Sequence, residues 1–142
     1  MASPDACRAA IVRAVPDAAE RLRVVLVEDD RDLADVTRIA LELEGLEVAV
    51  AHDGREGLEM IERLRPDVVI TDLIMPVLDG LQLIQRLQSA PEPRSPVIAI
   101  SAVGSRLRAA RDLGAVEALL KPVTPRDLAS SARKAWRRAA HP

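Results

Sequence analysis

Short apolar runs without helical spacing alternate along most of this chain with segments whose apolar residues recur at helical intervals. The clearest run, residues 68–72, lies between Pro66 and Pro76 and ends at Asp72. It predicts a strand that is buried on both faces and that delivers a carboxylate at its C-terminal end. Runs of this kind predict five strands, at residues 22–27, 48–51, 68–72, 97–100 and 117–120.

The segments between and after these runs predict five amphipathic helices. Gly45 ends the first helix in the manner of a C-cap glycine, and Pro125 suits the first turn of the last helix. Asp53 and Asp79 each precede a glycine and are expected to cap the second and third helices. The apolar positions at helical spacing are Leu33, Val36, Ala40, Leu43, Leu58, Ile61, Leu64, Leu81, Ile84, Leu87, Leu128, Ala132 and Trp136.

Strands that alternate with helices imply an α/β fold with a parallel, doubly wound sheet and right-handed crossovers. The C-terminal ends of parallel strands share one edge, which is where open α/β sheets carry out chemistry. Polar residues that end the predicted strands should therefore meet at this edge, although the chain separates them widely. These residues are Glu28, Asp29, Asp72, Ser101 and Lys121.

The length of 142 residues suits one domain with one core. We expect residues 1–21 to be an N-terminal extension, either a mobile tail or a loosely held helix, followed by the domain at 22–139 and a tail at 140–142. The single cysteine, Cys7, excludes an internal disulfide framework and suits a reducing cytosol. No segment resembles a signal peptide or a membrane span, so the sequence predicts a cytoplasmic protein.

The net charge of -2 argues against general affinity for nucleic acid. The charge is unevenly distributed, because the sequence from Gly104 onward contains nine Lys and Arg residues and only three acidic residues. A solvated face explains this excess most simply, and the alternative is a surface that meets an acidic protein. Trp136 is the only Phe, Trp or Tyr residue, so stacking platforms for bases or sugars are absent.

Three carboxylates, one hydroxyl and one lysine at a common edge indicate a particular chemistry. Clustered carboxylates repel one another unless a divalent cation neutralises them, and oxygen ligands completed by water suit Mg²⁺. With this repulsion cancelled, Asp72 is free to attack phosphorus, while Lys121 and Ser101 contact the remaining phosphoryl oxygens. The pattern predicts phosphoryl transfer by positioning and charge neutralisation.

These residues resemble those of receiver domains of two-component response regulators, in the stand-alone, chemotaxis-regulator-like form. The resemblance covers about residues 23–139 and implies a flavodoxin-like (βα)5 fold, with five strands in the order 2-1-3-4-5 and five helices. Four motifs carry it in the correct order. They are Val27-Glu28-Asp29-Asp30, the segment Asp72-Leu73-Ile74-Met75-Pro76-Val77-Leu78-Asp79-Gly80, Ser101-Ala102, and Leu113-Gly114-Ala115 leading to Lys121-Pro122.

The resemblance implies that Asp72 accepts a phosphoryl group from a phosphohistidine of a histidine kinase or a histidine phosphotransfer protein. It also makes Ser101 the switch hydroxyl, pairs Lys121 with the phosphoryl group, and implies a cis peptide between Lys121 and Pro122. The Mg²⁺ ligands that it implies are Asp29 and Asp72 directly, Glu28 mainly through water, and the backbone carbonyl of Ile74.

The sequence departs from the family pattern at four positions. Ala118 and Val123 stand where receivers commonly carry aromatic residues, which puts the common switch mechanism in doubt. We therefore expect output through backbone shifts of the loop after Ser101 and of the fourth helix, or through another surface. Ile74 and Val103 are apolar and cannot orient a water molecule, so they predict a slowly hydrolysed acyl phosphate.

Two other functions remain open at this point. One is a receiver-like scaffold that is not phosphorylated. The other is an enzyme, a haloacid-dehalogenase-like phosphatase, which requires an Asp-x-Asp pair after the first strand; Asp30-Arg31-Asp32 has this spacing but lies late. Asp30 is more simply a solvated neighbour of the acidic pair or an N-cap of the first helix than a third ligand. His52 lies in a loop, and Trp136 covers the core.

The favoured interpretation is a signalling domain rather than an enzyme, with at most self-catalysed phosphorylation and dephosphorylation. A stand-alone receiver passes its signal to a downstream protein by direct contact or phosphorelay, and the chain can also be a receiver excised from a longer protein. A homodimer through the fourth helix, fifth strand and fifth helix is a further expectation. Direct binding to nucleic acid or membranes is not expected.

Overall fold

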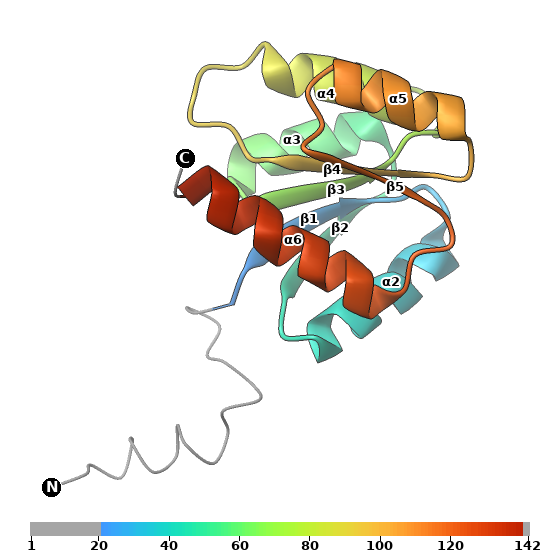
Figure 1. The fold of residues 1–142 in the computed structure, drawn as a ribbon, viewed down its shortest axis with the longest axis vertical. Helices are drawn as coiled ribbons and strands as arrows, with labels where there is room; N and C mark the ends of the chain where they lie inside the picture. Colours follow the sequence, from blue (N-terminus) through green and yellow to red (C-terminus); the bar gives the residue numbers. More distant parts are fainter. Residues whose placement is uncertain (1–20, 141–142) are drawn as a thin grey trace, which may run out of the picture.

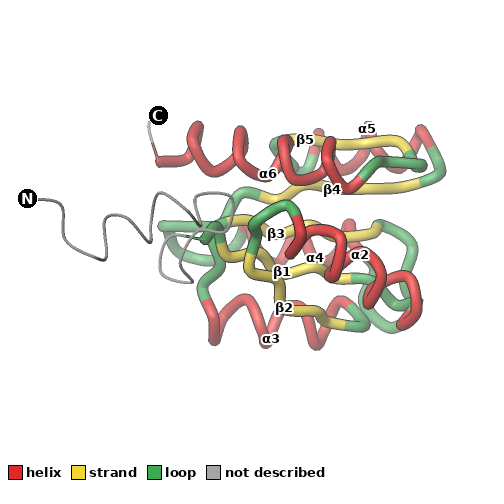
Figure 2. The backbone as a smooth tube through the Cα atoms, turned by 90° about the horizontal axis from the view of Figure 1, so that it is seen from below, coloured by secondary structure: helices red, strands yellow, loops and turns green. Residues whose placement is uncertain are grey.

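A computed structural model describes residues 21–140, which form a central parallel sheet between two layers of helices (Figure 1). The strands lie in the order β2-β1-β3-β4-β5, as Figure 2 shows from the side of α2 and α6. The flavodoxin-like order and the parallel pairing are both confirmed. The strands are β1 (Arg23–Val27), β2 (Glu47–Ala51), β3 (Val68–Asp72), β4 (Val97–Ser101) and β5 (Glu117–Leu120).

Two helices cover one face of the sheet and three cover the other, as a doubly wound topology requires (Figure 1). The pair is α2 and α6, and the group of three is α3, α4 and α5. None of these helices has the length and hydropathy needed to span a membrane. The helices are α2 (Arg31–Leu43), α3 (Gly54–Leu64), α4 (Gly80–Gln88), α5 (Gly104–Asp112) and α6 (Pro125–Ala140).

The predicted N-terminal extension, residues 1–21, lies outside the described residues except for Arg21, as do residues 141 and 142. The predicted C-terminal tail begins inside α6, because this helix continues to Ala140.

The core consists of aliphatic side chains and alanines in two clusters, one on each face of the sheet. Strands β3 and β4 are buried along their whole length, because helices cover both of their faces. Leu128 and Ala132 of α6 enter the cluster beneath α2 and α6, as their spacing predicts. Trp136 does not close this core as expected, because 42% of its surface remains exposed.

Helix α2 is present as predicted, but most of the apolar residues that recur there at helical intervals lie on the outer face of the helix. Val36 is 64% exposed and Leu43 is 84% exposed, and Ile39 between them is 50% exposed. The face that meets the sheet is carried by Ala34 and Leu41, which are fully buried. The sequence contains two apolar stripes here, and helical periodicity alone does not show which one packs on the sheet.

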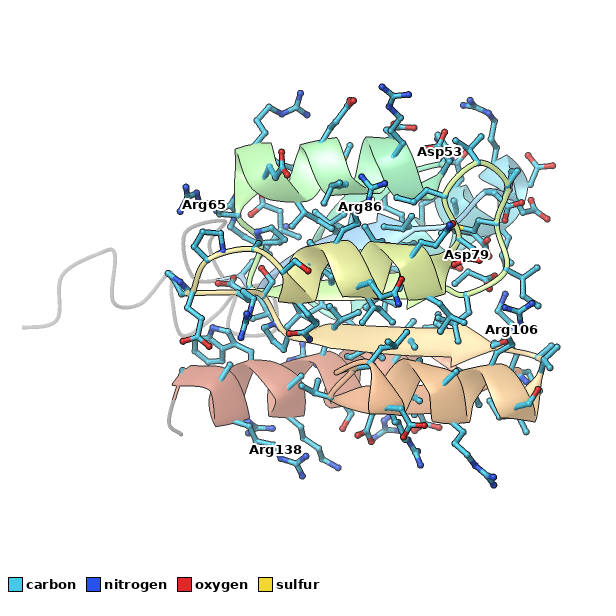
Figure 3. All side chains as sticks on the ribbon, turned by 90° about the horizontal axis from the view of Figure 1, so that it is seen from above. Asp53, Arg65, Asp79, Arg86, Arg106 and Arg138 are labelled. Carbon is cyan, nitrogen blue, oxygen red and sulfur yellow. The ribbon has the colours of Figure 1, made fainter. Side chains whose placement is uncertain are left out.

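Aspartate caps start three helices at the carboxyl edge of the sheet. The side chain of Asp30 accepts a hydrogen bond from Leu33 N, Asp53 from Glu56 N, and Asp79 from Gln82 N in a capping box. Figure 3 shows Asp53 and Asp79 at the end toward which β4 points, with Arg65 at the opposite end. These caps fix where the loops that surround the site enter their helices.

Candidate functional site

An acidic cluster lies at the carboxyl edge of the sheet, between β1 and β3. Glu28 and Asp29 directly follow β1, and Asp72 is the last residue of β3. One carboxylate oxygen of each residue lies within 4.8 Å of the others. Because β2 and β3 lie on opposite sides of β1, this is the point at which the strand order reverses, where ligands bind in open α/β sheets.

Lys121 brings a positive charge to the acidic cluster. Its Nζ lies 2.7 Å from Asp72 Oδ2 and 3.5 Å from Glu28 Oε1. The backbone N–H of Lys121 donates to Ser101 O at 2.9 Å, which ties the end of β5 to β4. The Lys121–Pro122 peptide is cis, as the resemblance implies. The ammonium therefore pairs with carboxylates from two different strand ends.

Burial and charge perturb two of these groups. Desolvation raises the pKa of Glu28 to about 7, the charge of Asp72 adds to this rise, and Lys121 opposes it. For Lys121, desolvation lowers the pKa, but the hydrogen bond and charge of Asp72, together with Glu28, outweigh it and the pKa is raised. The cluster thus holds excess negative charge that one ammonium does not fully compensate.

Ser101 and Ile74 are neighbours of Asp72, Ser101 on the adjacent strand β4 and Ile74 two residues further along the chain. Ser101 ends β4 and is fully buried, and its Oγ accepts a hydrogen bond from Val103 N at 3.1 Å. In the β3–β4 register Asp72 lies opposite Ile100, the neighbour of Ser101. The N–H of Ile74 donates to Asp72 Oδ1 at 3.1 Å, and its side chain is 52% exposed. The site therefore gathers residues from four strand ends.

Two neighbours of Asp72 support its backbone and were not predicted from the sequence. Thr71 Oγ1 donates to Asp72 O at 2.8 Å within the core. Gly80, the first residue of α4, approaches so closely that a Cβ atom there would lie 2.3 Å from Asp72 O. Gly80 was visible in the Asp79-Gly80 pair, but the sequence did not show which backbone it approaches.

The loop that leaves Asp72 contains a strained turn at Val77. This residue has φ 68°, and Leu78 N donates to Pro76 O at 2.9 Å across it. A hydrogen bond between residues two apart at positive φ defines a γ-turn of the strained kind. A β-branched residue is unfavourable in this conformation, so strain is stored within five residues of Asp72.

Asp30 and His52 do not contribute side chains to the cluster. Asp30 is the N-cap of α2, as predicted. The N–H of His52 donates to Glu56 Oε2, and its ring Nδ1 lies 3.4 Å from the backbone O of Glu28. Asp32 is exposed in the first turn of α2. The Asp30-Arg31-Asp32 spacing therefore does not build a second carboxylate pair at the site.

Fold and site together define a flavodoxin-like domain with an acidic pocket and a paired lysine at its topological switch point. The model of the response regulator receiver domain family matches residues 24–133. The chain therefore belongs to the receiver domains of two-component response regulators.

Response regulator MprA from Mycobacterium ulcerans is similar to this chain, with 38% identity over 120 residues, 82% of this chain and 51% of that protein. Transcriptional regulatory protein TrcR from Mycobacterium tuberculosis is 32% identical over 122 residues, 84% of this chain and 47% of that protein. The chain spans about half the length of these relatives. A receiver domain protein from Clostridium thermocellum superimposes with a TM-score of 0.78 at 30% identity, covering 83% of this chain and 96% of that one.

Proposed function

We propose that this receiver takes a phosphoryl group onto Asp72 from a phosphohistidine of a histidine kinase or a histidine phosphotransfer protein. An oxygen of the Asp72 carboxylate forms a bond to phosphorus while the phosphorus–nitrogen bond of the donor breaks, and the bonding electrons return to the imidazole. The nucleophile is the carboxylate that pairs with Lys121, so the step needs no general base. The observation that carries the proposal is the 2.7 Å pairing of Asp72 with Lys121 inside the acidic cluster.

Magnesium fits the oxygen atoms that converge here. Glu28, Asp29 and Asp72 offer hard oxygen ligands within 4.8 Å of one another, and their combined charge exceeds that of Lys121. We infer that Asp29 and Asp72 bind Mg²⁺ directly, that Glu28 acts through water, and that the backbone carbonyl of Ile74 completes the protein ligands. Bound Mg²⁺ would supply the positive charge that lets an anionic phosphoryl group approach a carboxylate.

Lys121 and Ser101 are proposed to bind the oxygens of the transferred group. Lys121 exchanges its contact with Asp72 Oδ2 for a phosphoryl oxygen, which keeps its charge paired. The Ser101 hydroxyl, which now accepts a hydrogen bond from Val103 N, is free to donate its own proton to another phosphoryl oxygen. Movement of Ser101 would carry the Val103 backbone with it, which links phosphorylation to the start of α5.

Phosphorylation is tested by incubating the protein with acetyl phosphate and Mg²⁺ and measuring the intact mass. The wild type should gain one phosphoryl group, and Asp72→Asn should gain none. Asp30→Asn is the matched control, because Asp30 lies beside the acidic pair and asparagine also caps helices well. Labelling of Asp72→Asn, or no labelling of the wild type, would refute the proposal. The second outcome would favour the scaffold function.

The outer stripe of α2 supports a protein as the phosphodonor. Val36, Ile39 and Leu43 form an exposed apolar stripe on the helix that starts just after the acidic pair. We propose that a donor helix packs on this stripe and so brings its phosphohistidine to Asp72. Val36→Glu should slow transfer from a phosphohistidine protein and leave labelling by acetyl phosphate unchanged. Equal effects on both donors would exclude the stripe as a docking surface.

The output surface is proposed to include α5, β5 and α6. Val116, which precedes β5, is 47% exposed, and Leu120 at its end is 57% exposed, with arginines on the flanking helices. This combination suits a homodimer or contact with an acidic downstream protein. Sedimentation with and without acetyl phosphate and Mg²⁺ tests the homodimer, which should weaken when Leu120 is changed to Glu.

A further inference from the structure

A cavity opens beside the acidic cluster, between the first half of α2 and the segment that joins β5 to α6. Its volume is about 390 Å³, within the range of small-molecule sites. Figure 1 shows α2 and α6 on the same face of the sheet. Leu26 of β1 and Ile100 of β4, which belong to the core cluster on this face, line the cavity. The residues that line it are Leu26, Val27, Glu28, Leu33, Thr37, Asp72, Ile100, Lys121, Pro122, Val123 and Leu128.

Most of the side chains that line the cavity are apolar. Leu26 is 2% exposed, Leu128 is 3% exposed and Ile100 is 8% exposed, although all three line it. Leu33, which is 42% exposed, lies at the mouth. A concave site with a mostly apolar lining and a few polar groups favours a ligand with an apolar body and a polar end. At about 30 Å³ for each water molecule, the volume corresponds to roughly a dozen waters.

Thr37 of α2 and Val123 of the segment before α6 line this space with short side chains. The core elsewhere on this face is closed by larger side chains such as Leu41 and Leu46, which are fully buried. A larger side chain at Val123 should therefore fill the cavity.

One end of the cavity is polar, and its charges determine what it can accept. Glu28 and Asp72 bring two carboxylates to this end against the single ammonium of Lys121, so an anionic ligand would be repelled. A cationic ligand would have to compete with Lys121 for the same carboxylates. The Thr37 hydroxyl makes no hydrogen bond to any other of residues 21–140 and so offers a free donor and acceptor at the wall.

We propose that this cavity binds a small, uncharged amphipathic molecule, whose apolar body packs between Leu33 and Val123 and whose hydroxyl bonds to Thr37. Val123 and its neighbour Pro122, which also lines the cavity, directly follow Lys121. Occupancy therefore restrains the segment that positions the lysine beside Asp72. This coupling rests on the proposed function of Asp72 and Lys121, whereas the binding itself does not.

Benzyl alcohol is a suitable probe, with toluene as the matched molecule that lacks the hydroxyl. Titration of isotope-labelled protein, without Mg²⁺ or phosphodonor, should give saturable NMR shifts at Thr37, Val123 and Leu128. Val123→Phe should abolish them by filling the cavity, while Val116→Phe, an exposed valine outside the cavity, should not. Thr37→Val should weaken the binding of benzyl alcohol roughly fivefold, because one hydrogen bond is lost, and should leave the binding of toluene unchanged.

Linear, unsaturable shifts, or a Val123→Phe protein that binds like the wild type, would overturn the site. If Val123→Phe fails to fold, Leu33→Trp at the exposed mouth serves the same purpose. Coupling is measured by titrating Mg²⁺ with and without benzyl alcohol. Linkage requires that benzyl alcohol changes the affinity for Mg²⁺ by the same factor by which Mg²⁺ changes the affinity for benzyl alcohol. A factor of one overturns the coupling. Saturable benzyl alcohol binding in a protein that Mg²⁺ and acetyl phosphate do not affect would instead refute the proposed function and leave the cavity site standing.

Discussion

Replacing Glu28 with glutamine should make the metal-free protein more stable at alkaline pH. Desolvation, with repulsion from Asp72, raises the pKa of Glu28 from 4.5 to about 7, so the folded state holds a proton there that the unfolded state releases. The folded protein thus binds more protons between these two values. The free energy of unfolding of the metal-free wild type should accordingly fall as pH rises from 4.5 to about 7, and the Glu28 contribution should be constant outside this window.

The size of this effect follows from the same pKa. At about 1.36 kcal/mol for each pKa unit, the rise from 4.5 to about 7 corresponds to roughly 3 kcal/mol. Glutamine has nearly the same shape, keeps an oxygen acceptor near Lys121 and carries no charge to desolvate. Glu28→Gln should therefore match the wild type near pH 4.5 and exceed it by up to roughly 3 kcal/mol at pH 8.

Urea unfolding in EDTA at several pH values measures this difference. Glu62→Gln is the control, because Glu62 is an exposed acid on α3 far from the cluster in sequence. Adding Mg²⁺ should stabilise the wild type more than Glu28→Gln, since the charge at Glu28 then has a partner. If the free energy of unfolding of Glu28→Gln changes with pH in parallel with that of the wild type from pH 4.5 to 8, burial of the Glu28 carboxylate does not destabilise the protein as predicted.

Three further substitutions test the loops around Asp72. Val77→Gly should raise the free energy of unfolding by about 1 kcal/mol in urea, because glycine accepts the positive φ at this position and Val77 is 80% exposed; a loss of stability would contradict the strained turn. Gly80→Ala should cost about 3 kcal/mol or more, since the added Cβ would lie 2.3 Å from Asp72 O, and thermal unfolding at wild-type temperature would show that α4 can move away. The wild-type acyl phosphate should hydrolyse slowly, and Ile74→Asn should speed phosphate release on the order of tenfold; a fast wild type that the change leaves unaffected would remove this idea.

The strand order and the edge cluster could be predicted because strong local signals and general topology point to the same result. Residues 68–70 form an apolar run that leads to Asp72, and the polar residues at the strand ends have to meet once the sheet is parallel. Asp30, Asp53 and Asp79 were likewise predictable as caps, since capping depends on a few neighbouring residues.

The features that sequence reasoning missed depend on tertiary packing. The apolar spacing of α2 selected Val36 and Leu43, but Ala34 and Leu41 pack on the sheet instead. Trp136 was predicted to face inward and is nevertheless 42% exposed, whereas the buried positions of α6 are Leu128 and three alanines. The close approach of Gly80 to the backbone of Asp72 joins two segments through space, and no local pattern reports such a distance.

The position of Trp136 determines what an optical experiment on this protein can detect. It is the only strong fluorophore in the sequence, and it lies eleven residues after Pro125, about 16 Å along α6 from the end that borders Lys121. Its emission should therefore follow detachment or unfolding of this helix and should scarcely respond to events at the acidic cluster. A spectroscopic reporter of the site will have to be introduced, and exposed Val103 at the start of α5 is a position where a second indole would lie close to the changes of interest.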